Sequence, residues 1–188
     1  MRDLLVHLGA LREGHFVLTS GRHADRFFLL ARLFEQPPAA AWIGAALAER
    51  VREAGWGPVD AVVGPAMGGI LLAYEVARHL GARAMFAEKG DEPGTMRLRR
   101  GFRLAPRERV LAVEDVLTTG GSVHRALSAA EAEGARVVGV AAVVRRGRHT
   151  LPFAHPTVAL LADDARDWPP EACPLCRAGE AAVRPKEA

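Results

Sequence analysis

Long apolar runs, lysine and cysteine are scarce in this chain of 188 residues. No stretch approaches the roughly 18 consecutive apolar residues that span a bilayer, and residues 1–11 lack the basic start and long apolar centre of a secretory signal. We therefore expect a cytoplasmic protein without a membrane partner. Lys89 and Lys186 are the only lysines, so arginine carries almost all of the positive charge. Arginine suits the bidentate binding of phosphate or carboxylate, although a basic surface also serves RNA.

Cys173 and Cys176 are the only cysteines, and they form one C-x-x-C pair near the C-terminus. Such a pair is half of a tetrahedral zinc site, and two copies across a dimer could complete one. Reduced free thiols are the favoured interpretation, because the chain offers no second cysteine pair. The seven histidines show no spacing typical of metal ligands, and we assign none of them a role.

The rest of the sequence alternates between short apolar runs and amphipathic helical patterns. This alternation favours an α/β fold with a mostly parallel central sheet flanked by helices. We expect residues 1–188 to form a single domain, with residues 1–36 in a small N-terminal hood and residues 165–188 in a C-terminal tail. In the hood we predict a first helix capped by Asp3. The stretch that leads up to Arg100 is predicted to be irregular. The predicted strands are 16–19, 26–30, 59–63, 83–87, 110–113, 136–144 and 158–161, and the predicted longer helices are 37–55, 69–80 and 123–133.

The segment 109–122, which reads RVLAVEDVLTTGGS, is the most informative part of the chain for function. It runs from a predicted strand through Glu114 and Asp115 into a turn rich in hydroxyls and glycine, and a helix follows. At a helix N-terminus, unpaired backbone N–H groups and the positive end of the helix dipole favour an anion. Gly120 and Gly121 let a ligand approach the backbone closely, so the turn predicts a phosphate site. The two carboxylates suit sugar hydroxyls.

The spacing excludes two better-known phosphate loops. A Walker loop needs a lysine before its Ser or Thr, and a dinucleotide fingerprint needs G-x-G-x-x-G, neither of which TTGGS supplies. A second glycine-rich turn, residues 64–69, also opens a predicted helix. Ligands bind beyond the carboxyl ends of the strands in such sheets, so we expect the two turns to serve a substrate with two phosphate groups. For residues 109–122 the alternative is a tight strand-to-helix turn with two solvated acids, and for residues 64–69 it is close helix packing at Gly68 and Gly69.

VEDVLTTGGS resembles the diphosphoribose-binding motif of the type I phosphoribosyltransferases. Together with GHFVLTSGRHADRFF (14–28), VVGPAMGGILLAYEVARHLG (62–81) and MRLRRGF (96–102), it resembles the orotate phosphoribosyltransferases, particularly their bacterial and archaeal members with a short mobile loop. The resemblance covers nearly the whole chain. It implies the type I phosphoribosyltransferase fold and transfer of ribose 5-phosphate from phosphoribosyl diphosphate to N1 of orotate. The products would be orotidine 5'-monophosphate, a pyrimidine precursor, and pyrophosphate.

The resemblance also implies roles for individual residues. Asp115 is expected to hold the ribose and Lys89 to counter the charge on the departing pyrophosphate, so both are expected to be catalytic. The diphosphate and the ribose are expected to contact Met67, Gly68, Lys89, Glu114, Asp115, Val116, Leu117, Thr118, Thr119, Gly120, Gly121 and Ser122. Orotate is expected to contact Phe27, Phe28, Thr118 and Arg146.

Some of these roles have structural alternatives. A guanidinium group matches the carboxylate of orotate in two parallel hydrogen bonds, but Arg146 could also belong to a solvated basic turn. One of Phe27 and Phe28 could simply pack in the core. The turn at 64–69 corresponds to the pyrophosphate loop of the family, which often contains a strained or cis peptide.

The chain departs from the family pattern in two places. Thr19 stands where many orotate enzymes carry a lysine, and Lys89 is the only evident cation in the stretch that corresponds to their mobile loop. The arginines within residues 97–100 could assist it or form a solvated face. Glycines and a proline leave the loop free to act as a lid over the site.

Mg²⁺ is the expected cofactor, held mainly by substrate oxygens and water. The resemblance implies a homodimer in which one subunit's loop completes the other's site, and small-molecule substrates rather than nucleic acid as ligands. Two alternatives remain: a purine phosphoribosyltransferase would share both glycine-rich turns, and a non-catalytic regulator of the same fold could bind RNA through its arginines.

Overall fold

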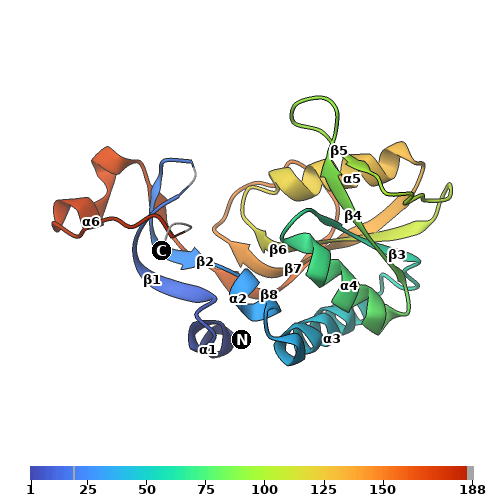
Figure 1. Cartoon of the computed structure of the whole chain (residues 1–188), viewed down its shortest axis with the longest axis horizontal. Coiled ribbons are helices and arrows are strands. Elements are labelled where there is room, and N and C mark those ends of the chain that lie inside the picture. The colour runs from blue at the N-terminus through green and yellow to red at the C-terminus, as the bar shows by residue number, and fades with distance from the viewer. Residues whose placement is uncertain (19, 186–188) are drawn as a thin grey trace.

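The computed structural model describes residues 1–18 and 20–185 (Figure 1). Its centre is a six-stranded sheet in the order β5-β4-β3-β6-β7-β8. The strands are β3 (Ala61–Pro65), β4 (Arg83–Lys89), β5 (Met96–Leu98), β6 (Arg109–Leu117), β7 (Arg136–Arg146) and β8 (Thr157–Asp163). β5 pairs antiparallel with β4, whereas the other neighbours pair in parallel. The mostly parallel sheet confirms the α/β prediction, and β5 corrects the irregular stretch expected before Arg100.

Alternate strand residues bury their side chains on opposite faces of this sheet. The flanking helices are α3 (Pro37–Glu53), α4 (Gly69–Leu80) and α5 (Gly121–Ala132). Val62 and Leu111 pack in one hydrophobic cluster with residues of α3 and α4. The next residues along the same strands, Val63 and Ala112, face the opposite way and pack with residues of α5. The two-residue period of the strands therefore places helices on both faces.

The helices begin and end close to the residues that the sequence indicates. α3 begins at Pro37. Proline suits this position because the N–H that it lacks would have no acceptor within the helix. α4 ends at Leu80 because Gly81 adopts a φ of 68°, the left-handed conformation that favours glycine. The expected cap is wrong: α1 (Arg2–His7) has Met1 at its N-cap, and Asp3 lies within the first turn, where its charge suits the helix dipole. No helix in the described part of the chain is long and apolar enough to cross a membrane.

The hood is a smaller antiparallel sheet that lies beside the main sheet (Figure 1). Its strands, in the order β1-β2-β9, are β1 (Leu11–Val17), β2 (His23–Phe28) and β9 (Asp167–Trp168). β1 and β2 correspond to the predicted strands 16–19 and 26–30 with shifted bounds, and they pair antiparallel as a hairpin. Thr19 lies outside the described residues. Because β9 belongs to the C-terminal tail, hood and tail pair with each other. The remaining short helices are α2 (Ala31–Phe34), η1 (Pro170–Ala172) and α6 (Pro174–Arg177).

The strand order changes direction at β3. The chain passes from β3 through α4 to β4 on one side, and after β5 it enters β6 on the other side of β3. Ligands of open α/β sheets bind outside the carboxyl ends of the strands at such a switch point. The two glycine-rich turns follow β3 and β6, so both leave the sheet at this point, as the sequence predicts.

Candidate functional site

The turn after β3 is packed so closely that its glycines have no room for a side chain. A Cβ atom on Gly64 would lie 2.3 Å from the carbonyl oxygen of Gly69, and one on Gly69 would lie 2.9 Å from Cα of Gly64. These two glycines thus serve close packing of strand against helix. Gly68 differs, because a Cβ atom there would lie 2.5 Å from Oδ2 of Asp115 on β6. Gly68 therefore brings the first turn directly against the acidic pair.

Two further features of this turn concern Met67. The peptide bond between Ala66 and Met67 is cis, a feature that the family resemblance implies at this point. The Met67 side chain is 82% exposed, so it packs against little of the chain. Met67 is therefore accessible to a ligand.

The turn after β6 leads into α5 and lines a cavity of about 270 Å³. Glu114, residues 116–122 and Arg125 surround this cavity. Gly120 adopts a φ of 79°, and a Cβ atom there would lie 2.9 Å from the Leu151 side chain, so the position requires glycine on both counts. The first N–H groups of α5 have no intrahelical acceptors. Hydroxyls, backbone donors and a guanidinium group thus surround a space that suits a phosphate.

Glu114 is the buried carboxyl group of this cavity, with 7% of its surface exposed. Burial raises the pKa of Glu114 well above its ordinary value, and the charge of the adjacent Asp115 raises it further, while Arg125 opposes both effects. Asp115 is only partly buried, and its Oδ1 accepts a hydrogen bond of 2.7 Å from the N–H of Val116. The two carboxyl groups therefore differ in environment although they are neighbours in sequence.

Two arginines that sequence reasoning missed support the second turn. Arg145, near the end of β7, donates hydrogen bonds to the carbonyl oxygens of Leu117, at 3.2 Å, and Thr118. It therefore holds the backbone where β6 gives way to the turn. Arg125 lines the cavity from α5. Its place one helical turn after Gly121 is a spacing signal that could have identified it.

Arg146 is buried, with 8% of its surface exposed, so it does not belong to a solvated basic turn. Its Nη1 lies 4.0 Å from the carboxylate of Asp167, and its Nη2 is buried without a hydrogen-bond partner among the described residues. Burial lowers the pKa of Arg146, whereas Asp167, Asp25 and Asp163 act in the opposite direction. Buried hydrogen-bond donors are normally paired, so Nη2 of Arg146 is available to donate to an acceptor on a ligand.

Phe27 and Phe28 follow each other on β2 and point to opposite faces of the hood. Phe28 is 8% exposed and packs in the same hydrophobic cluster as α3 and α4. This is the core packing that the sequence left open for one of the pair. Phe27 is only partly buried, with its ring centre 6.0 Å from that of Phe16. Phe27 is therefore the better placed of the two rings to contact a ligand.

Lys89 ends β4 at the base of a hairpin that projects from the body of the molecule (Figure 1). Its side chain is exposed and forms no ion pair with any described residue. The arginines of the hairpin differ in this respect. Their ion pairs are Arg97 with Asp91, Arg99 with Asp91, and Arg100 with Glu88. Lys89 is thus the hairpin cation, within the described residues, that is not already neutralised.

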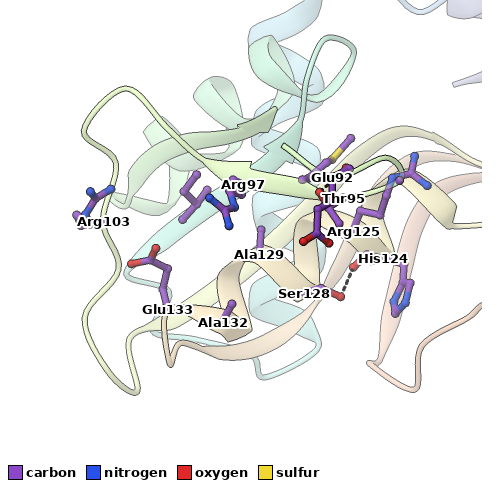
Figure 2. A pocket seen from close by; sticks show the side chains of 13 residues that line it. Glu92, Thr95, Arg97, Arg103, His124, Arg125, Ser128, Ala129, Ala132 and Glu133 are labelled. Carbon is purple, nitrogen blue, oxygen red and sulfur yellow. Dashed lines mark hydrogen bonds between the residues drawn. The ribbon is translucent and has the colours of Figure 1, made fainter. Parts of the chain in front are cut away.

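A larger cavity, of about 730 Å³, lies beside the site, between the hairpin and α5. Figure 2 shows Thr95 and Arg97 on the hairpin side and Ser128, Ala129 and Ala132 on the helix side. Arg125 lines both cavities. Neither Glu114 nor a glycine-rich turn lines the larger cavity, whereas Glu114 and the turn after β6 line the smaller one, so the chemistry is better assigned to the smaller one.

Comparison with known proteins agrees with this geometry. Residues 30–172 match the phosphoribosyl transferase domain family. The chain is 48% identical to an orotate phosphoribosyltransferase from Heliobacterium modesticaldum over 183 residues, which cover 97% of this chain and 94% of that protein. Two crystal structures share the fold at 24% identity. One is an orotate phosphoribosyltransferase from Aeropyrum pernix, with a TM-score of 0.69 over 85% of this chain and 92% of that one. The other is an adenine phosphoribosyltransferase from Rhodothermus marinus, with a TM-score of 0.65 over 86% of this chain and 99% of that one.

Proposed function

The chain belongs to the phosphoribosyl transferase domain family, and on this premise we propose that it is an orotate phosphoribosyltransferase. It transfers ribose 5-phosphate from phosphoribosyl diphosphate to N1 of orotate, with orotidine 5'-monophosphate and pyrophosphate as products. The fold alone does not select the base, since an adenine enzyme shares it. The 48% identity to an orotate enzyme over nearly the whole chain favours orotate.

The contact between Gly68 and Asp115 carries the assignment of the substrate site. It joins two anion-binding turns through a carboxylate. This arrangement matches a substrate that has a diphosphate at one end, a 5'-phosphate at the other and ribose hydroxyls between them. We assign the 5'-phosphate to residues 118–122 and Arg125, and the diphosphate to the backbone of Met67 and Gly68. Glu114 and Asp115 then face the ribose.

Orotate fits the side of the site that faces the hood. The unpartnered Nη2 of Arg146 suits the carboxylate of orotate, because a buried guanidinium group gains a charge-assisted hydrogen bond there. Phe27 offers a ring against the pyrimidine, and Thr118 offers a hydroxyl. Phe28 contributes by packing the strand that carries Phe27.

Mg²⁺ suits this site because it prefers hard oxygen donors: the carboxyl group of Glu114 and several hydroxyls line the cavity, and Asp115 follows Glu114 in the chain. Glu114 and Asp115 would hold the ion together with substrate oxygens and water. When bound, the ion would neutralise part of the negative charge of the diphosphate. The buried Glu114, whose pKa is raised, is the group whose ionisation a nearby cation would favour.

The residues of the site act chiefly by positioning and by electrostatic stabilisation. As the bond between C1 and the diphosphate oxygen breaks, positive charge builds on the ribose, as in glycoside cleavage. The carboxylate of Asp115 stabilises that charge, and the turn after β6 keeps the ribose phosphate fixed while C1 moves toward N1 of orotate. Lys89 balances the negative charge on departing pyrophosphate.

A homodimer in which Lys89 serves the neighbouring site is part of the proposal. An apolar stripe supports it: Leu71 and Tyr74, which lie three residues apart on α4, are 53% and 59% exposed. Large exposed apolar side chains that share one helix face mark interaction surfaces. A second copy of this chain seated on the stripe would lie next to the first turn of the site.

A base screen with phosphoribosyl diphosphate and Mg²⁺ tests the function. Loss of the ultraviolet absorbance of orotate, with equal release of pyrophosphate, is the expected result, and adenine, guanine, hypoxanthine, xanthine and uracil should release none. Turnover of a purine would keep the phosphate sites but overturn the base assignment. A protein without any turnover that binds RNA in a salt-sensitive way would instead be a regulator.

Gly68→Ala is expected to reduce kcat/KM for phosphoribosyl diphosphate by about tenfold or more, because the new Cβ would displace Asp115 from the ribose. Gly57→Ala is the matched control, since nothing lies within 4 Å of a Cβ at that position. Steady-state kinetics of both variants check the prediction. Equal kinetics for the two would show that the contact between Gly68 and Asp115 does not position the carboxylate.

A further inference from the structure

Four side chains outside the candidate active site converge at the tip of the hood. They are His15 on β1, His23 on β2, and Cys173 and Cys176 in the C-terminal tail. One ligand atom from each lies within 4.8 Å of every other. Figure 1 shows α6, which holds Cys176, beside the β1–β2 hairpin and away from the central sheet.

The distances among these atoms fit a tetrahedral metal site. Zn–N bonds of about 2.0 Å and Zn–S bonds of about 2.3 Å place the corners of a tetrahedron about 3.3 to 3.8 Å apart. Sγ of Cys173 lies 3.5 Å from Nε2 of His15, and Sγ of Cys176 lies 3.7 Å from the same atom. Sγ of Cys176 lies 3.2 Å from Nδ1 of His23. The two histidine nitrogens, at 2.7 Å, need to separate by only a fraction of an ångström around an ion.

The surroundings of His15 favour metal binding over a network of hydrogen bonds. Its Nδ1 lies 2.8 Å from the carbonyl oxygen of Glu180, which can only accept, so Nδ1 carries the hydrogen and donates it. Nε2 of the neutral ring is then left with a lone pair, toward which His23, Cys173 and Cys176 all converge. A histidine that donates one ring N–H to a carbonyl and turns the other nitrogen to a metal is the usual arrangement in zinc sites.

Burial and packing give the site a structural purpose. His15 is 5% exposed and Cys173 is fully buried. Phe16 and Ala24 are also buried nearby, yet none of these residues belongs to the hydrophobic clusters of the described chain. The tip of the hood therefore has little apolar core of its own, and small units of this kind are commonly held by a metal.

We propose that His15, His23, Cys173 and Cys176 of one chain bind a single Zn²⁺ ion that fastens the C-terminal tail to the hood. Two thiolates and two neutral imidazoles balance the charge of the ion, and their N₂S₂ set is typical of zinc. Binding releases the two thiol protons to solvent. The site replaces the bridge between two subunits that the cysteine pair alone suggested, because histidines of the same chain supply the other two ligands.

The hairpin explains how two histidines without ligand spacing in the sequence become neighbours. Val17 pairs with His23 and Phe16 with Ala24, and the register of β1 against β2 shifts between Glu13 and Phe16. This irregularity contains His15. The tail is tied to the same strand, since the N–H of Val183 donates to the carbonyl oxygen of His15 at 2.9 Å.

Metal analysis of protein purified without a histidine tag tests the proposal. The wild type is expected to contain about one zinc per chain. Cys176→Ser and His23→Gln should each lose most of it, and both positions are accessible enough for the variants to fold. His79→Gln, which changes a histidine on α4 outside the cluster, should retain the full content. A zinc content of about half an equivalent per chain in the wild type would mean that the ion bridges two subunits. Full zinc content in Cys176→Ser would mean that the ion binds elsewhere. Either result would overturn the proposal.

Two further measurements separate ligation from adventitious binding. Cobalt in place of zinc should give the intense visible bands of a tetrahedral site with sulfur ligands in the wild type and lose them in Cys176→Ser. A strong zinc chelator should lower the Tm of the wild type by at least about 5 °C and leave Cys176→Ser nearly unchanged. A zinc-free wild type with Cys173 and Cys176 joined in a disulfide would also overturn the proposal. The zinc measurements are independent of the base screen, so either proposal can fail alone.

Discussion

Asp115→Asn is expected to reduce kcat/KM for phosphoribosyl diphosphate by at least about tenfold, the loss that follows from removing one charged partner from a bound hydroxyl and a developing cation. The amide has nearly the same shape, so the turn around Gly68 should keep its packing. The substitution therefore removes the negative charge that faces the substrate and little else. Steady-state kinetics with phosphoribosyl diphosphate as the varied substrate measure the effect.

A pH profile adds a second readout to this experiment. The charge of Asp115 is one of the causes that raise the pKa of Glu114, so Asp115→Asn should move the pKa of Glu114 down toward its ordinary value. Asp3→Asn is the matched control, because it makes the same change at an exposed position on α1. Wild-type kinetics in Asp115→Asn would remove Asp115 from the assigned role and leave the ribose to Glu114.

Local signals explain why the main sheet and its helices could be predicted from the sequence. α4 occupies the predicted residues because its amphipathic run is bounded by a glycine-rich turn before it and by Gly81 after it, and α3 begins at the predicted proline. β6 and α5 likewise enclose a turn whose hydroxyls and glycines identify it. Each of these elements is specified by residues that are close together in the chain.

The features that sequence reasoning missed depend on contacts between distant segments. β9 has two residues and exists because the tail pairs with β2. Arg146 is buried, and its carboxylate partner Asp167 is on β9 of the hood, which nothing near Arg146 in the sequence indicates. His15 and His23 become neighbours of the C-terminal cysteines only after the hairpin and the tail have packed together. Pairing and burial of this kind follow from the whole fold, so a local pattern does not reveal them.

Lys89→Ala is expected to reduce kcat by about a hundredfold, the effect typical of removing one group that stabilises charge in a transition state. Lys89 is exposed and forms no ion pair with the described residues, so its loss should leave the fold intact. Arg97→Ala is the matched control on the same hairpin, because Arg97 already pairs with Asp91 and should matter little. Single-turnover kinetics would assign the loss to the chemical step rather than to substrate binding.

A mixing experiment decides whether Lys89 serves its own site or that of a partner. Lys89→Ala and Asp115→Asn are expected to retain about a hundredth and at most about a tenth of the wild-type activity, respectively, but a mixed dimer built with Lys89 acting in trans has one site with both residues intact. Random assortment makes half of the dimers mixed, so unfolding and refolding the two variants together should restore about a quarter of the wild-type rate. If Lys89 acts within its own chain, each site of a mixed dimer lacks one of the two residues, and the rate stays at the average of the two separate variants. Recovery would therefore establish both the dimer and the shared site, and its absence in a mixture shown to contain mixed dimers would place Lys89 in cis.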